Sequence, residues 1–211
     1  MTSDLIFYTN PMSRGQIVRW MLEEVGAPYE TRLLDFGTTM KAADYLAINP
    51  MGKVPAIVHA GEVVTECAAI CAYLADAFPN AGLAPSPADR ADYYRWLFFT
   101  AGPVEQAITA KFFGIEPDTD QQRSAGFGTL AHALDALESA VAGKTYVAGG
   151  RFTAADVYVG SQIDWGMEFG TIAPRPAFEA YVTPLRERGA YKRAKEIDNG
   201  LIAKMQASKP A

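Results

Sequence analysis

Short apolar runs and segments with helical spacing alternate through the first third of the chain. The apolar run 5–8 stops at a loop with proline and predicts a buried strand. Helical spacing follows up to Gly26, a common helix stop, with apolar residues at Ile17, Val18, Met21, Leu22 and Val25. The same reading predicts a strand at 29–34, a short helix at 39–48, strands at 54–58 and 62–64, and a helix that begins within TECAAIC (65–71). The order β-α-β-α-β-β-α is thioredoxin-like, with a right-handed βαβ crossover at its start.

The second part of the chain contains only helical patterns. The stretch FPNAGLAPSP (78–87) has the proline and glycine content of a linker. Beyond it we expect helices at 88–113 with a kink at Gly102-Pro103, then at 119–141, 153–167, 176–188 and 191–197, while 203–211 has no strong pattern. We therefore predict a thioredoxin-like domain at 1–79, a linker at 80–87 and an all-helical domain at 88–211, that is, an α/β fold plus an all-α fold.

Composition narrows the class of partner. The net charge of -5 argues against a phosphate-binding face for nucleic acid. No apolar stretch approaches the roughly 20 residues of a membrane span, and the start lacks a signal-peptide pattern. Cys67 and Cys71 lie one helical turn apart, with parallel rather than converging bonds, so we expect two free thiols. Free thiols fit a reducing compartment, and we expect a cytoplasmic protein.

The dipeptide Val54-Pro55 lies between a loop and a strand, where proline is tolerated because no ladder hydrogen bond is lost. A cis bond there would turn the main-chain groups of Val54 outward, ready to pair with an extended ligand like an added strand. The alternative is a trans proline that only begins the strand.

Several chemistries lack their residues. The sequence has no Gly-x-Ser-x-Gly elbow, and its only histidines, His59 and His132, lie in a predicted strand and a predicted helix. No cluster of ligand residues predicts a metal site. The loop 10–13 reads Asn-Pro-Met-Ser, without the cysteine that glutaredoxin chemistry needs.

The stretch NPMGKVPAIVHAGEVVTECAAICAYL (49–74) resembles the glutathione-binding signature of the cytosolic glutathione S-transferases. The resemblance extends to the linker, the helical second half and a Thr153-x-x-Asp156 helix-capping box. The chain resembles bacterial members of the zeta-, theta- or beta-like type. This resemblance implies a homodimeric transferase that activates the glutathione thiol for attack on an apolar electrophile, typically in detoxification, with no metal.

The resemblance implies a position for each part of glutathione. Val54, with Pro55 cis, would pair its main chain with the cysteinyl part, and Glu66 would hold the γ-glutamyl amino group. Cys67 replaces the usual serine at the γ-glutamyl carboxylate, where a helix N-terminus suits an anion. Lys53 would face the glycyl end, unless it is a solvated surface lysine.

The residue that activates the thiol is expected in the first loop, TNPMSRGQ (9–16). A hydroxyl donor near the sulfur and a helix dipole both favour the thiolate, which is the nucleophile. Ser13 is the first candidate, and Thr9 and Asn10 are alternatives. Tyr8 lies within the predicted strand, and Ser13 can also be a plain N-cap.

The electrophile is expected against the helical half, with Tyr94, Phe112 and Trp165 as candidates for an apolar wall. An aromatic stripe of this kind also fits a plain core. Two alternative functions remain open: a glutathione-dependent disulfide or peroxide reductase on the same fold, and a regulatory protein that binds glutathione without turnover.

Overall fold

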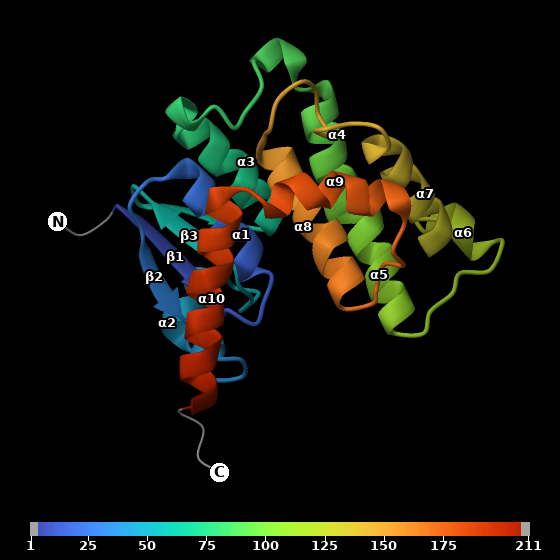
Figure 1. Cartoon of the computed structure of the whole chain (residues 1–211). Coiled ribbons are helices and arrows are strands. Elements are labelled where there is room, and N and C mark those ends of the chain that lie inside the picture. Colours follow the sequence, from blue (N-terminus) through green and yellow to red (C-terminus); the bar gives the residue numbers. More distant parts are fainter. Residues whose placement is uncertain (1–3, 208–211) are drawn as a thin grey trace. The chain divides into compact units, whose positions relative to one another are not determined.

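The computed structural model describes residues 4–207 and divides the chain into two compact units. The first unit contains the chain up to Gly82 together with the segment from Glu187 onward, and the second contains Leu83–Arg186. The order of elements in the first unit confirms the predicted thioredoxin-like sequence of strands and helices (Figure 1).

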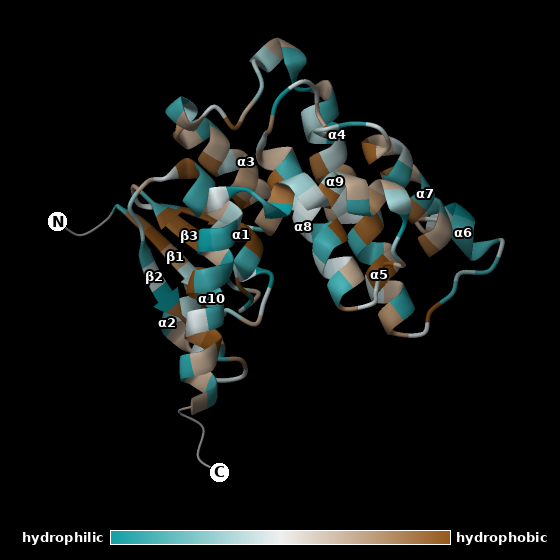
Figure 2. Cartoon of the chain, viewed as in Figure 1, coloured by the Kyte–Doolittle hydropathy of each residue, from teal (hydrophilic) through white to brown (hydrophobic). Residues whose placement is uncertain are grey.

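The first unit is built on a four-stranded mixed sheet of order β2-β1-β3-β4. Its strands are β1 (Leu5–Thr9), β2 (Glu30–Leu33), β3 (Ala56–His59) and β4 (Glu62–Thr65). β1 and β2 are parallel, joined through α1 (Gly15–Val25), and the other pairs are antiparallel. Figure 2 shows β1 and β3 as mainly hydrophobic, which is typical of central strands covered on both faces.

Helices cover both faces of this sheet, and successive side chains of β1 point alternately to the two faces. On one face, Tyr8 packs with Met40, Tyr45 and Ala56 in a cluster beside η1 (Thr39–Lys41) and α2 (Ala43–Leu46). α3 (Cys67–Ala77) contacts β3 and α1, and the short η2 (Pro79–Ala81) follows it.

The last helix, α10 (Gly189–Ala207), packs along α1 and so belongs to the first unit. The expected helical domain at 88–211 therefore does not coincide with a compact unit of the structure. The expected short helix at 191–197 is also too short, and the weak pattern at 203–207 is helical. Residues 208–211 of that stretch lie outside the described part of the chain.

The second unit is all-helical, in agreement with the predicted fold class. Its elements are η3 (Pro87–Asp89), α4 (Ala91–Phe99), the π-helix η4 (Thr100–Val104), α5 (Glu105–Phe112), α6 (Gln121–Ser124), α7 (Leu130–Val141), α8 (Ala154–Glu168) and α9 (Pro176–Arg186). The expected kink at Gly102-Pro103 is this π-turn, because Pro103 cannot donate a helical hydrogen bond. The expected continuous helix at 119–141 is wrong, because an irregular segment with Gly126 and Gly128 separates α6 from α7.

The capping box at the start of α8 is present as predicted. Asp156 accepts from the Thr153 N–H (2.8 Å), the Val147 N–H (2.7 Å) and the Tyr181 hydroxyl (2.7 Å). Burial raises the pKa of this carboxyl, and the bonds it accepts oppose that shift. The network therefore fixes the start of α8 and has a structural role.

Candidate functional site

Strand register brings three distant segments of the first unit to one end of the sheet. Tyr8 of β1 lies opposite Ala56 of β3, and Ala56 lies opposite Thr65 of β4, with both pairings antiparallel. The residues after Tyr8, before Ala56 and after Thr65 therefore share that end. They include eight of the residues predicted from the sequence: Thr9, Asn10, Ser13, Lys53, Val54, Pro55, Glu66 and Cys67.

The Val54–Pro55 peptide bond is cis, so the trans alternative is wrong. Pro55 is buried, and the Val54 side chain packs against the cluster that contains Tyr8 and Tyr45. Within residues 4–207, neither the N–H nor the C=O of Val54 takes part in a hydrogen bond of the chain itself. This stretch thus offers one donor and one acceptor for a peptide-like ligand.

The loop before Val54 is held by buried polar side chains. Asn49 is 4% exposed, donates from Nδ2 to the Lys53 carbonyl (2.8 Å) and accepts from the Met51 N–H (3.1 Å). The Tyr45 hydroxyl donates to the same Lys53 carbonyl (2.5 Å), and burial raises the pKa of Tyr45 to about 12. The main chain that leads into Val54 is therefore fixed before any ligand arrives.

Lys41, which the sequence reasoning missed, adds a cation beside this loop. Its ammonium donates to the carbonyls of Gly52 (2.7 Å) and Met51 (3.2 Å). Gly52 has φ of 55°, a backbone conformation that favours glycine, and its position lies close to the Lys41 side chain. Lys41 and Lys53 are both exposed, so the loop carries two positive charges next to Val54. Only its place in a short helix ahead of the motif could have pointed to Lys41.

The N-terminus of α3 forms the second wall. Glu66 is exposed and has φ of 66° and ψ of 121°, an uncommon conformation for a residue with a Cβ. Such outliers cluster at functional sites, where the surrounding structure maintains them. The first-turn amides of α3, such as that of Ala68, have no acceptor within the helix and favour an anion.

Cys67 connects α3 to the first loop. Cys67 is 8% exposed, and its thiol donates to the Arg14 carbonyl (3.6 Å). Cys71, one turn further, is fully buried, and burial raises the pKa of its thiol above the ordinary range. Both cysteines are free, as predicted. Cys67 therefore lies at the site, whereas Cys71 is part of the core.

The first loop presents Ser13 as a half-buried hydroxyl. Ser13 Oγ donates to the Asn10 carbonyl (2.6 Å) and accepts from the Gly15 N–H (3.0 Å). The second bond reaches the N–H of the first residue of α1, but the N-cap of α1 is Arg14, which makes no side-chain cap bond, so Ser13 is not a plain N-cap. Its proton can turn from the Asn10 carbonyl to a thiolate, because a charge-assisted bond is the stronger one.

The other first-loop candidates are less available. Asn10 is 1% exposed, and its side chain is used within the unit, donating to the Leu34 carbonyl (2.8 Å) and accepting from the Met12 N–H (2.9 Å). Thr9 is fully buried against the start of α1, where a Cβ on Gly15 would lie 1.9 Å from its hydroxyl. Tyr8 packs within β1 against Tyr45, with ring centroids 5.5 Å apart.

Known proteins share both halves of this chain. Residues 12–77 match the model of the glutathione S-transferase N-terminal domain, and residues 102–188 match that of the C-terminal domain. A Zea mays protein named glutathione S-transferase 3 is 34% identical over 72% of this chain and 73% of its own length. The chain belongs to the glutathione S-transferase family.

Further relatives of this transferase agree. Glutathione S-transferase GST-4.5 of Xanthomonas campestris is 30% identical over 77% of this chain and 83% of its own length. A sphingomonad glutathione S-transferase solved in complex with glutathione has a TM-score of 0.75 and 30% identity, and covers 92% of this chain and 98% of its own. These likenesses confirm the predicted bacterial-type family and its fold.

The aromatic residues expected to contact the electrophile all lie in the second unit of the transferase. Phe112 at the end of α5 is 79% exposed and Tyr94 on α4 is 40% exposed, while Trp165 on α8 is half-buried against Phe169. Tyr93 and Trp96 from the same stripe are buried, so the core interpretation applies to those two.

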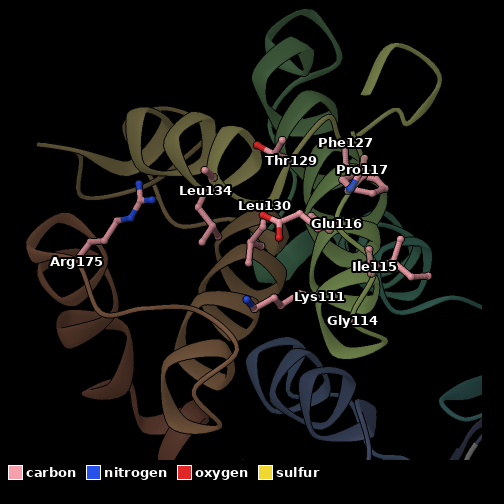
Figure 3. Close-up of a pocket in the computed structure, with 13 residues that line it drawn as sticks. Lys111, Gly114, Ile115, Glu116, Pro117, Phe127, Thr129, Leu130, Leu134 and Arg175 are labelled. Carbon is pink, nitrogen blue, oxygen red and sulfur yellow. The ribbon is translucent and has the colours of Figure 1, made fainter. Parts of the chain in front are cut away.

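The helical unit also has a cavity of about 550 Å³ between α5, α7 and the segment that connects them. Figure 3 shows Lys111 of α5 and Leu130 and Leu134 of α7 around this hollow. None of Tyr94, Phe112 and Trp165 lines it. This cavity is therefore separate from the aromatic residues predicted for the electrophile.

Two kinds of feature are absent from residues 4–207 of the transferase. No group of three or more His, Cys, Asp or Glu side chains is arranged to hold a metal ion there. Within the same residues, every helix is too short or too polar to span a bilayer.

Proposed function

We propose that this glutathione transferase binds glutathione along Val54 and across the N-terminus of α3, and that Ser13 stabilises the thiolate. The convergence of three segments at one sheet end, with the unpaired main chain of Val54 between them, carries the proposal. Val54 pairs with the cysteinyl part of the peptide, as an added strand would. The thiol then lies toward the first loop, where Ser13 has the accessible hydroxyl.

The ends of glutathione are assigned by charge. The γ-glutamyl carboxylate meets the first-turn amides of α3 at Cys67, and the Glu66 carboxylate holds the γ-glutamyl amino group. The glycyl carboxylate meets Lys41 and Lys53, whose positions next to Val54 give it a positive surface.

The reaction is transfer of the glutathione thiolate to an apolar electrophile, with Tyr94, Phe112 and Trp165 as candidates for its contact surface. Retention on immobilised glutathione, followed by turnover with a halodinitrobenzene, tests this directly. Retention without turnover on any aromatic electrophile favours the regulatory alternative. Turnover only with disulfides or hydroperoxides favours the reductase alternative. The proposal is contradicted if the protein shows no retention and no turnover.

We also propose that the transferase is a cytoplasmic homodimer. The free thiols of Cys67 and Cys71 fit the reducing cytoplasm, where conjugation removes reactive electrophiles. Exposed large apolar residues such as Phe98 and Val63 fit a homodimer, because subunit contacts would cover them. Sedimentation at micromolar concentration would measure the mass, and a monomer there would contradict the dimer.

A further inference from the structure

The last helix of the chain reaches the loop of Ser13 through one side chain. α10 packs along α1, with Arg188 paired to Glu24 (2.6 Å) and the Tyr191 ring against Trp20 (centroids 5.0 Å apart). At the start of α1, the Lys195 ammonium donates to Gln16 Oε1 (3.3 Å). Contact between the two helices thus extends to the first turn of α1.

Gln16 in turn holds the turn that contains Ser13. Its Nε2 donates to the Pro11 carbonyl (2.6 Å), and its main-chain N–H donates to the Ser13 carbonyl (3.2 Å). One residue therefore spans the turn from both sides. A shift of Gln16 would move Ser13 relative to the thiol.

Lys195 decides which way the Gln16 amide faces. An ammonium group has donors and no acceptor, so it requires the amide oxygen. The amide nitrogen is then left for the Pro11 carbonyl, which needs a donor. Without Lys195, one of the two side-chain bonds that orient the Gln16 amide is lost, and only the bond to the Pro11 carbonyl holds it.

We infer that Gln16 and Lys195 are positioning residues for the transferase reaction, which act through the 11–13 turn on the hydroxyl of Ser13. This inference rests on the proposed role of Ser13. It makes α10, far from the site in sequence, a part of the apparatus that sets the thiol pKa. Neither residue touches the reacting atoms.

Lys195→Met tests the inference, because it removes the donor to Gln16 Oε1 and replaces it with an uncharged side chain. At saturating glutathione, the pH profile of kcat/KM for the electrophile reports the pKa of the bound thiol. We expect the acid limb to move to higher pH and kcat at neutral pH to fall roughly threefold to tenfold. KM for glutathione should change less, because Val54 and α3 are untouched. Lys195→Arg should restore the profile, since its guanidinium also donates to Oε1.

Lys192→Met is the matched control. Lys192 lies on the same helix, is 57% exposed at its side chain and pairs with Glu187, so the charge change is equal but the contact to Gln16 remains. Its profile should match that of the unmodified protein. Gln16→Leu should reproduce the effect of Lys195→Met.

The outcomes distinguish the role of Ser13 from that of Gln16 and Lys195. An unchanged acid limb in both Lys195→Met and Gln16→Leu, with Ser13→Ala shifted, would overturn the positioning role alone. An unchanged acid limb in Ser13→Ala would overturn the proposed role of Ser13. Loss of stability in Lys195→Met without movement of the acid limb would show a purely structural contact and also overturn the inference.

Discussion

Arg19 and Asp198 join α1 to α10 through an ion pair in the core of the first unit. Both residues are 1% exposed, and Arg19 Nε lies 2.8 Å from Asp198 Oδ1. The guanidinium also donates to the hydroxyls of Tyr29 (3.2 Å) and Thr31 (3.1 Å) and lies over the Phe7 ring, 5.1 Å from its centroid. Removing Arg19 therefore leaves a carboxyl group in an apolar environment without its cation.

We expect Arg19→Met to lower the free energy of unfolding by about 3–5 kcal/mol, the usual cost of breaking a buried pair from one side. The double variant Arg19→Met/Asp198→Leu should recover most of this, because the uncompensated charge is gone. Arg193→Met is the control: its pair with Glu23 is 55% exposed on the arginine side, so the loss should be about 1 kcal/mol or less.

The loss should also depend on pH. Burial already raises the pKa of Asp198, and Arg19 opposes that shift, so its removal raises the pKa further. A carboxyl group whose folded pKa exceeds its unfolded value contributes stability below the unfolded pKa. That contribution is lost as pH rises through the folded pKa. Arg19→Met should therefore lower the free energy of unfolding more at neutral pH than in mild acid. Adding Asp198→Asn should remove this difference between the two pH values.

Urea unfolding followed by far-UV circular dichroism at both pH values measures these changes. A decrease in the free energy of unfolding below about 1 kcal/mol for Arg19→Met would refute the reasoning, because exposed ion pairs contribute in that range. A double variant as unstable as the single one would refute it as well.

Three further predictions concern the glutathione site. Cys67 should be alkylated faster without glutathione than with it, because the bound γ-glutamyl carboxylate covers the thiol and opposes its charge. Cys71 should stay unmodified in both states. Mass spectrometry after timed alkylation measures both rates. Gly15→Ala should destabilise the protein by about 1–3 kcal/mol in chemical unfolding, because the new Cβ meets Thr9. Lys41→Met should raise KM for glutathione about tenfold in steady-state kinetics and change kcat less, because a charge-assisted contact to the glycyl carboxylate is lost.

Each of these has an opposing result. Equal alkylation rates with and without glutathione would remove Cys67 from the site. Wild-type stability of Gly15→Ala would mean that α1 can shift away from Thr9. An unchanged KM in Lys41→Met, with Lys53→Met as the matched comparison, would remove Lys41 from the glycyl end.

The thioredoxin-like order could be predicted because strand and helix periods differ and the punctuating residues, such as Gly26, mark their ends. The arrangement around the glutathione motif could be predicted as well, because β3, β4 and α3 follow one another with short turns. Contacts between residues that are far apart in the sequence could not be predicted, because they depend on how the elements pack. The residues of the motif itself do not indicate Lys41, whose contact with the Gly52 carbonyl depends on the folded structure.

α10 shows the limit most clearly. Figure 2 shows it as largely hydrophilic, and its buried residues are Ala190, Ala194 and Asp198. Their spacing of four is a weak signal, and a buried aspartate breaks the apolar pattern on which helix assignment depends. Only the partner residue Arg19, far away in sequence, explains why Asp198 is inside.

The thiol pKa of bound glutathione measures how strongly Ser13 stabilises the thiolate. Ultraviolet difference titration of the complex follows the thiolate without any electrophile. The account predicts a pKa at least about one unit below the ordinary thiol value near 8.5, and a return toward that value in Ser13→Ala. A pKa that is the same in the unmodified protein and in Ser13→Ala would contradict it.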